Sequence, residues 1–154
     1  MKITQRTATL NDAEILLNWR NDPNTRKFSR QPEQISSEEH LDWLRARLEK
    51  VQLEPYYLFV QGSRAIGMSR LDAVSDSLQR LEISIMVDPN QHSKGIGTRI
   101  LNLTCESFFL LHPEKSIVAH ISRHNFISQK LFISAGFKAQ TSFGDFLRFE
   151  KSLD

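Results

Sequence analysis

The sequence is poor in several features, and each absence excludes a class of protein. Cys105 is the only cysteine among 154 residues, which excludes an intramolecular disulfide and a zinc site built from several thiolates. The formal net charge of +2 is too small an excess to indicate nucleic-acid binding. No apolar run is long enough to span a bilayer, and the N-terminal segment has no apolar signal core. These absences predict a cytoplasmic protein that binds neither nucleic acid nor membrane.

The composition that remains is that of an ordinary globular chain. Hydrophobic residues make up 40% of the sequence and charged residues 25%, a balance typical of soluble domains. A chain of 154 residues is long enough to bury one sizeable core. No internal repeat and no linker rich in glycine, serine or proline divides it. We therefore predict a single domain over residues 1–154.

Capping and periodicity signals predict a mixture of helices and strands. Asn11 with Glu14, and Ser36 with Glu39, form capping-box patterns before runs with helical apolar spacing. Gly62-Ser63 lies between two apolar runs, as in a two-residue hairpin. Further strands are expected over 81–87 and 116–121, helices after residue 95 and from 125 until Gly136, and a closing hairpin over 137–151. This order of elements predicts an α/β or α+β domain.

The segment from Ile85 to Leu101, IMVDPNQHSKGIGTRIL, joins an apolar strand to a helix through a loop with two glycines. Gly95 and Gly97 at this junction predict an anion site. The first-turn N–H groups and the helix dipole attract phosphate, and glycine lets a ligand approach the backbone. The third glycine of the dinucleotide fingerprint is missing because Ile100 stands there, and the P-loop pattern also fails.

Two blocks of the sequence, correctly spaced, resemble the GNAT family of N-acetyltransferases. The first is V-D-P-x-x-x-x-K-G-I-G-x-x-I-L from Val87, and the second is N-x-x-S-x-K-L-F-x-x-A-G-F from Asn125. The resemblance is close from about Glu82 to Phe137. It implies a mixed, mostly antiparallel central sheet flanked by about four helices. It also implies acetyl-CoA as the co-substrate, and no metal.

The same resemblance implies which residues bind acetyl-CoA. The amides of Met86 and Val87 are expected to pair with the pantetheine arm and to polarise the thioester carbonyl. Asn125 is expected to hydrogen-bond the pantetheine, and Lys130 to lie near the adenosine phosphate. The glycine turn is expected to hold the pyrophosphate. This turn consists of His92, Ser93, Lys94, Gly95, Ile96, Gly97 and Thr98, with His92 where the family usually has Arg or Gln.

Three residues are candidates for proton transfer. Acetyl transfer to an amine needs a neutral nitrogen, so a base near the amine assists the reaction. His120 stands where related ribosomal-protein acetyltransferases carry a glutamate, and a neutral histidine accepts a proton. Glu82 competes for this role, since some family members use a glutamate on this strand. Phe132 replaces the tyrosine that commonly protonates the leaving thiolate, which leaves that proton to Ser128, water or His120.

The sequence leaves the acceptor open between alternatives. Residues 20–30 carry four cationic side chains against one acidic side chain, an excess that suits an anionic substrate. Arg20, Arg30 and Trp43 are the candidates for binding it. Residues 16–44, with the spacing WRN and EH..W, also loosely resemble enzymes that acetylate UDP-linked amino sugars, which favours a primary amine on such a sugar. Ribosomal-protein acetyltransferases share a similar opening. The alternatives are a protein or peptide N-terminal acetyltransferase and a catalytically silent acetyl-CoA-binding module. An oligomer is compatible with the sequence.

Overall fold

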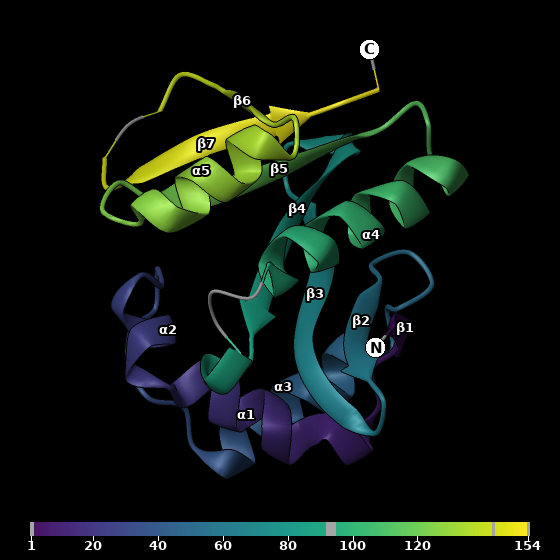
Figure 1. The fold of residues 1–154 in the computed structure, drawn as a ribbon, viewed down its shortest axis with the longest axis vertical. Helices are drawn as coiled ribbons and strands as arrows, with labels where there is room; N and C mark the ends of the chain where they lie inside the picture. Colours follow the sequence, from purple (N-terminus) through teal and green to yellow (C-terminus); the bar gives the residue numbers. More distant parts are fainter. Residues whose placement is uncertain (1, 92–94, 143, 154) are drawn as a thin grey trace.

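A mixed sheet forms the centre of the computed structural model, which describes residues 2–91, 95–142 and 144–153 (Figure 1). Over these residues its seven strands are β1 (Ile3–Thr7), β2 (Tyr56–Gln61), β3 (Arg64–Val74), β4 (Ser77–Val87), β5 (Ser116–Ser122), β6 (Lys138–Ala139) and β7 (Phe146–Lys151). Their order in space is β1-β2-β3-β4-β5-β7-β6. Neighbours are antiparallel except for the parallel pair of β4 and β5. The predicted mixed, mostly antiparallel sheet is confirmed.

Helices cover both faces of this sheet. In the described ranges they are α1 (Ala13–Asn21), α2 (Pro23–Lys27), α3 (Ser37–Leu48), α4 (Ile96–Leu111) and α5 (Phe126–Ser134), with 3-10 turns η1 (Leu10–Asp12) and η2 (Pro89–Gln91). Figure 1 shows α4 and α5 crossing the same face. Alternation along β2 separates the two cores, since Leu58 packs with α1 and α3 whereas Phe59 packs with α4. No described helix is long and apolar enough to cross a membrane.

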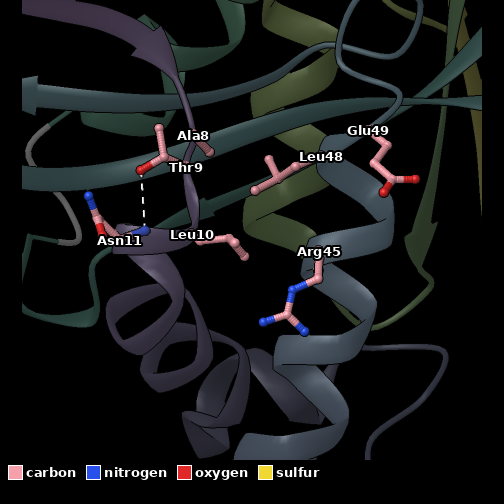
Figure 2. A pocket seen from close by; sticks show the side chains of 7 residues that line it. All are labelled: Ala8, Thr9, Leu10, Asn11, Arg45, Leu48 and Glu49. Carbon is pink, nitrogen blue, oxygen red and sulfur yellow. Dashed lines mark hydrogen bonds between the residues drawn. The ribbon is translucent and has the colours of Figure 1, made fainter.

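The two predicted helix starts had different outcomes. Ser36 caps α3 as expected, with its hydroxyl accepting a hydrogen bond from the Glu39 N–H at 3.1 Å. The capping box predicted at Asn11 and Glu14 was wrong. The chain turns earlier, through η1, so Thr9 accepts from the Asn11 N–H, a bond drawn as the dashed line in Figure 2, and Asp12 accepts from the Thr9 N–H. This short turn shifts the cap two residues toward the N-terminus.

Three turns that the sequence predicted are present in the structure. Gly136 follows α5 with φ of 95°, a left-handed conformation that suits glycine after a helix. Strands β2 and β3 meet at Gly62-Ser63, and the closing hairpin joins β6 and β7. The short helix α2 was not predicted. Asp22 caps this helix and Pro23 is its first residue, which are both helix-start signals that the sequence contains.

Candidate active site

Strands β4 and β5 are paired only at one end. The parallel ladder joins Arg80–Glu82 to Ser116–Val118 and then stops, although both strands continue beyond it. Past this point β4 stays paired with β3, and β5 with β7. Figure 1 shows the two strands diverging. Beyond residue 82, the edge of β4 that faces away from β3 is therefore not joined to β5. We call the region between the two strands, at their carboxyl ends, the gap.

The ladder between β3 and β4 decides which amides face this gap. Asp88 donates its N–H to the carbonyl of Ile66 at 2.9 Å, so these two residues form a hydrogen-bonded pair. Because such pairs alternate along antiparallel strands, the Met86 amide is directed at β3. The N–H groups of Ile85 and Val87 are directed toward the gap. Ile85 is therefore a better candidate than Met86 for contact with a ligand in the gap, and the sequence alone did not suggest it.

The register from Leu81 to Val87 is uniform against β3, so no bulge occurs within this described stretch of the ladder. The family resemblance implied that two adjacent amides, those of Met86 and Val87, reach the ligand together. In a regular strand, adjacent amides point to opposite sides. Residues two apart, such as Ile85 and Val87, share a side.

Helix α4 begins where β4 ends. Gly95 is left-handed with φ of 73° and supplies no side-chain cap to the helix. The amides of Ile96, Gly97 and Thr98 precede the first intrahelical bond, from the Arg99 N–H to the Gly95 carbonyl at 3.2 Å. They form the anion-attracting end of the helix. The predicted binding residues His92, Ser93 and Lys94 lie outside the described residues.

Gly97 lies close to both β4 and α5. A Cβ atom built on it would be 3.7 Å from Val87 on β4 and 3.5 Å from Leu131 on α5. These are ordinary contact distances, so Gly97 is close to its neighbours without being forced against them. The first turn of α4 therefore lies beside the carboxyl end of β4 and beside α5.

Helix α5 supplies the other predicted binding residues. The side-chain oxygen of Asn125 accepts the Ser128 N–H at 3.1 Å, which caps the helix and leaves the Asn125 amide nitrogen available to a ligand. Ser128 is the third residue of this helix, and no hydrogen bond between described residues joins it to His120. Lys130 is exposed. Asn125 thus caps α5, and its contact with the pantetheine stays a prediction, as does a proton-transfer role for Ser128.

The two competing base candidates form a pair. Glu82 lies opposite Val118 in the parallel ladder, so His120 is two residues further along β5 on the same face. His120 Nδ1 is 3.2 Å from Glu82 Oε2, and the side chains are 25% and 17% exposed. Nδ1 is buried and lacks an aligned hydrogen-bond partner in the described part of the chain. The two candidate bases therefore lie in contact, so a role for one does not exclude a role for the other.

Arg30 also contacts Glu82, and we call His120, Glu82 and Arg30 the His120 cluster. Its Nη2 donates to the same Glu82 oxygen at 2.6 Å, while its side chain is 54% exposed. The loop that carries it is tied to α1. Arg20 donates to the Gln31 carbonyl at 2.5 Å, and Asn21 exchanges two hydrogen bonds with Ile35, at 2.8 and 2.9 Å. Arg30 therefore has a carboxylate partner and is less available to an anionic substrate than its sequence position suggested.

Two tryptophans from the N-terminal helices have different environments. Trp19 is 4% exposed and belongs to the core between α1 and α3. Trp43 is 42% exposed, and the Arg70 guanidinium lies 5.1 Å from its ring centroid. Of these two tryptophans, Trp43 is the one that presents an aromatic surface to a ligand. Arg70 was not identified from the sequence, although its alternation with Met68 and Asp72 along β3 would have placed it on this face.

Other features exclude simple alternatives at this site. Phe132 is buried and packs its ring 5.0 Å from that of Phe137, so it is part of the core. Burial raises the pKa of the Cys105 thiol to about 11, which makes it a packing residue. Among the described residues no group of three or more His, Cys, Asp or Glu could hold a metal ion.

A hollow lies elsewhere, between η1 and α3. Figure 2 shows Leu10 facing Arg45 and Leu48 across it. Its volume is about 520 Å³, and its lining is Ala8, Thr9, Leu10, Asn11, Arg45, Leu48 and Glu49. None of these residues belongs to the His120 cluster or to the gap. The size of this hollow is therefore no guide to the chemistry.

A model of the family described as "Acetyltransferase (GNAT) domain" matches residues 2–138. A search of curated proteins found no significant match. Among solved structures, a domain from Methanocaldococcus jannaschii DSM 2661 is similar at 27% identity over 99% of each chain, with a TM-score of 0.84.

Two further similar structures carry functional descriptions of their own. Ribosomal-protein-alanine N-acetyltransferase from Brucella melitensis has 22% identity, covers 97% of this chain and 99% of its own, and has a TM-score of 0.81. Spermidine N-acetyltransferase from Vibrio cholerae, in complex with CoA and spermine, has 19% identity, 97% and 94% coverage, and a TM-score of 0.84. At these identities the likeness concerns the fold.

Proposed function

This chain belongs to the GNAT acetyltransferase family, and from that membership we propose that His120 and Glu82 act together as the proton acceptor. The protein is an acetyl-CoA-dependent N-acetyltransferase. The observation that carries the proposal is the 3.2 Å separation of His120 Nδ1 and Glu82 Oε2, where β4 and β5 part. A titratable pair beside the gap is available to an amine that approaches the thioester.

Acetyl-CoA would lie across the gap and along the first turn of α4. The amides of Ile96, Gly97 and Thr98 bind the pyrophosphate in this proposal. The Ile85 amide, directed from β4, pairs with the pantetheine and donates to the thioester oxygen as negative charge develops on it. Val87 stays assigned to the pantetheine arm on the resemblance alone. The Asn125 amide nitrogen and Lys130 contact the pantetheine and the adenosine phosphate. His92, Ser93 and Lys94 remain assigned to the pyrophosphate turn on sequence alone.

The proposed reaction balances with one histidine. The amine nitrogen forms a bond to the acetyl carbon as the C–S bond breaks, and His120 takes the amine's proton. Glu82 stabilises the resulting imidazolium by its negative charge. The proton then passes from His120 to the leaving thiolate, directly or through water. Phe132 cannot donate a proton, and no hydrogen bond between described residues joins Ser128 to this pair, so we assign both steps to His120.

For the acceptor, we propose a primary amine on a nucleotide-linked amino sugar. The support is charge, because Arg20 on α1 and Arg26 on α2 both donate to carbonyls of the loop that follows α2, which places two guanidinium groups together there. An anionic diphosphate suits guanidinium groups, which bind phosphate oxygens in pairs. A peptide with a free N-terminal amine is the alternative acceptor.

Thiol release from acetyl-CoA tests the proposal directly. UDP-linked amino sugars and peptides with free N-termini are compared as acceptors, with wild type and His120→Ala. The buried Cys105 should not react with the thiol reagent at neutral pH. We expect turnover with a UDP-amino sugar and a large loss of kcat in His120→Ala. Turnover only with peptides would replace the acceptor. Unchanged kcat in His120→Ala would refute the proton-transfer role.

A further inference from the structure

We propose that Arg20 and Arg70, with Trp43 beside them, form a subsite for the nucleoside diphosphate of the acceptor. The inference rests on the proposed acetyl transfer, because it places the acceptor's phosphates relative to the amine at His120 and Glu82. The sequence did not identify Arg70 as a binding residue. The support comes from position, charge balance and one unpartnered nitrogen.

Arg70 lies on the same face of the sheet as the proposed base. It pairs with Ser84 on β4, and the next pair on that face is Asp72 with Glu82. Two residues along a strand span roughly 7 Å. An acceptor can therefore place an amine at Glu82 and a charged group at Arg70 within the length of one sugar and its phosphates.

The charges around Arg70 do not cancel. Asp72 accepts from Arg47 at 2.8 Å and from Arg70 at 2.9 Å, so one carboxylate serves two guanidinium groups. Arg47 is otherwise occupied, since it also donates to the backbone carbonyls of Glu54 and Leu71 at 2.7 and 3.0 Å. Arg70 is the less committed member of this pair, and its side chain is 27% exposed. Positive charge thus remains on the face that borders the gap.

Arg20 adds an unsatisfied donor to this positive charge. Its Nη2 donates to the Gln31 carbonyl, whereas its Nη1 is buried without a hydrogen-bond partner over the ranges described. Burial lowers the pKa of Arg20, and Arg70 and Arg26 lower it further. Leaving a buried charged donor unpaired is costly. A phosphate oxygen at Nη1 would supply both the missing acceptor and the missing negative charge.

Trp43 and His40 define the side of the subsite formed by α3. The His40 ring lies 5.9 Å from that of Trp43 and is only 4% exposed. Burial, Arg20 and Arg70 together lower the pKa of His40, so this histidine senses the positive charge of both arginines. The exposed part of Trp43 offers a surface for a nucleobase. Two arginines with an aromatic surface favour a nucleoside diphosphate over a lone carboxylate.

Binding of UDP by calorimetry tests the subsite in protein saturated with CoA, so that the α4 terminus is already occupied. We expect Arg70→Gln to weaken UDP binding by about tenfold or more, and Arg70→Lys to weaken it less. The matched control is Arg45→Gln, which removes the same charge from the exposed face of α3, where Arg45 pairs with Asp42 at 3.8 Å. The control should bind UDP as wild type does.

Arg20 requires its own control because it also donates a hydrogen bond to the loop that carries Arg30. Asn21→Ala loosens the same loop without removing charge. Arg20→Met should weaken UDP binding about tenfold or more, and Asn21→Ala much less. An independent readout is the titration of His40 by NMR. Bound UDP should raise the His40 pKa in wild type, because the negative charge of UDP offsets the positive charge of Arg20 and Arg70.

Wild-type UDP affinity in Arg70→Gln, or an unmoved His40 titration at saturating UDP, would overturn the subsite. It would also be overturned if an acidic peptide, and not UDP, bound through Arg70. These outcomes are separable from failure of the proposed chemistry. The loss of kcat in His120→Ala can be measured with any accepted amine, whether or not that amine carries a phosphate.

Discussion

Replacing Glu82 with glutamine tests whether the two base candidates act as one unit. Glutamine keeps the size of the side chain and removes its charge. In the wild type, Glu82 lies 3.2 Å from the nitrogen of a histidine that becomes positively charged when it accepts the amine's proton. The charge of Glu82 is thus most useful in the transition state, and its loss should lower kcat more than it raises KM.

The size of the effect follows from this distance. Two unit charges 3.2 Å apart attract by roughly 3–5 kcal/mol at an effective dielectric constant of about 20 to 40. Arg30 binds the same oxygen and both groups are partly exposed, so about 1.5–3 kcal/mol is a realistic net value. That corresponds to a decrease in kcat of about 10- to 150-fold. His120→Ala removes the base itself and should cost about 10²- to 10⁴-fold.

A double-mutant cycle measures the coupling by thiol release at saturating acetyl-CoA. If Glu82 acts through His120, the double variant should be no slower than His120→Ala. Glu114→Gln is the matched control, because it removes a carboxylate 3.6 Å from His112, at the far end of α4. Multiplying losses in the double variant would refute the coupling. A wild-type kcat in Glu82→Gln would refute any role for its charge.

Three further changes probe other parts of the molecule. Gly97→Glu should bind acetyl-CoA about tenfold more weakly than the equally large Gly97→Gln, since only glutamate repels the pyrophosphate; equal affinities by calorimetry would contradict the phosphate assignment. Asp12→Asn should lower the unfolding free energy by about 1 kcal/mol at pH 7. Hydrogen bonds from Arg6 hold the pKa of Asp12 below its usual value, so this stabilisation is present above about pH 4 and is lost in more acidic solution. The melting temperatures of the variant and the wild type should therefore converge in acid. A difference in melting temperature that stays constant with pH would contradict this explanation. Gly67→Ala would place a Cβ 2.7 Å from the Met86 carbonyl oxygen, and a loss of about 1–3 kcal/mol is expected in denaturant unfolding, whereas an unchanged midpoint would show that the strands separate easily.

Local signals in the sequence identified most elements because the interactions behind them act within a few residues. A serine hydroxyl reaches an amide three residues on, so Ser36 marked the start of α3. A glycine after a helix supplies a left-handed conformation, so Gly136 marked the end of α5. The glycine junction at Gly95 was found in the same way. The cap at Thr9 was missed because Asn11, two residues later, is an equally suitable capping residue. Helix α2 was missed because it is only five residues long and has no apolar periodicity.

The candidate site depended on tertiary structure because its members come from separate strands. His120 and Glu82 were each identified as candidates, but only the parallel register of Glu82 with Val118 brings them within 3.2 Å. The choice between Ile85 and Met86 depends on which edge of β4 bonds to β3. A sequence states which residues can bond or ionise. Register and the parting of two strands decide which of them meet, since those depend on the packing of the whole sheet.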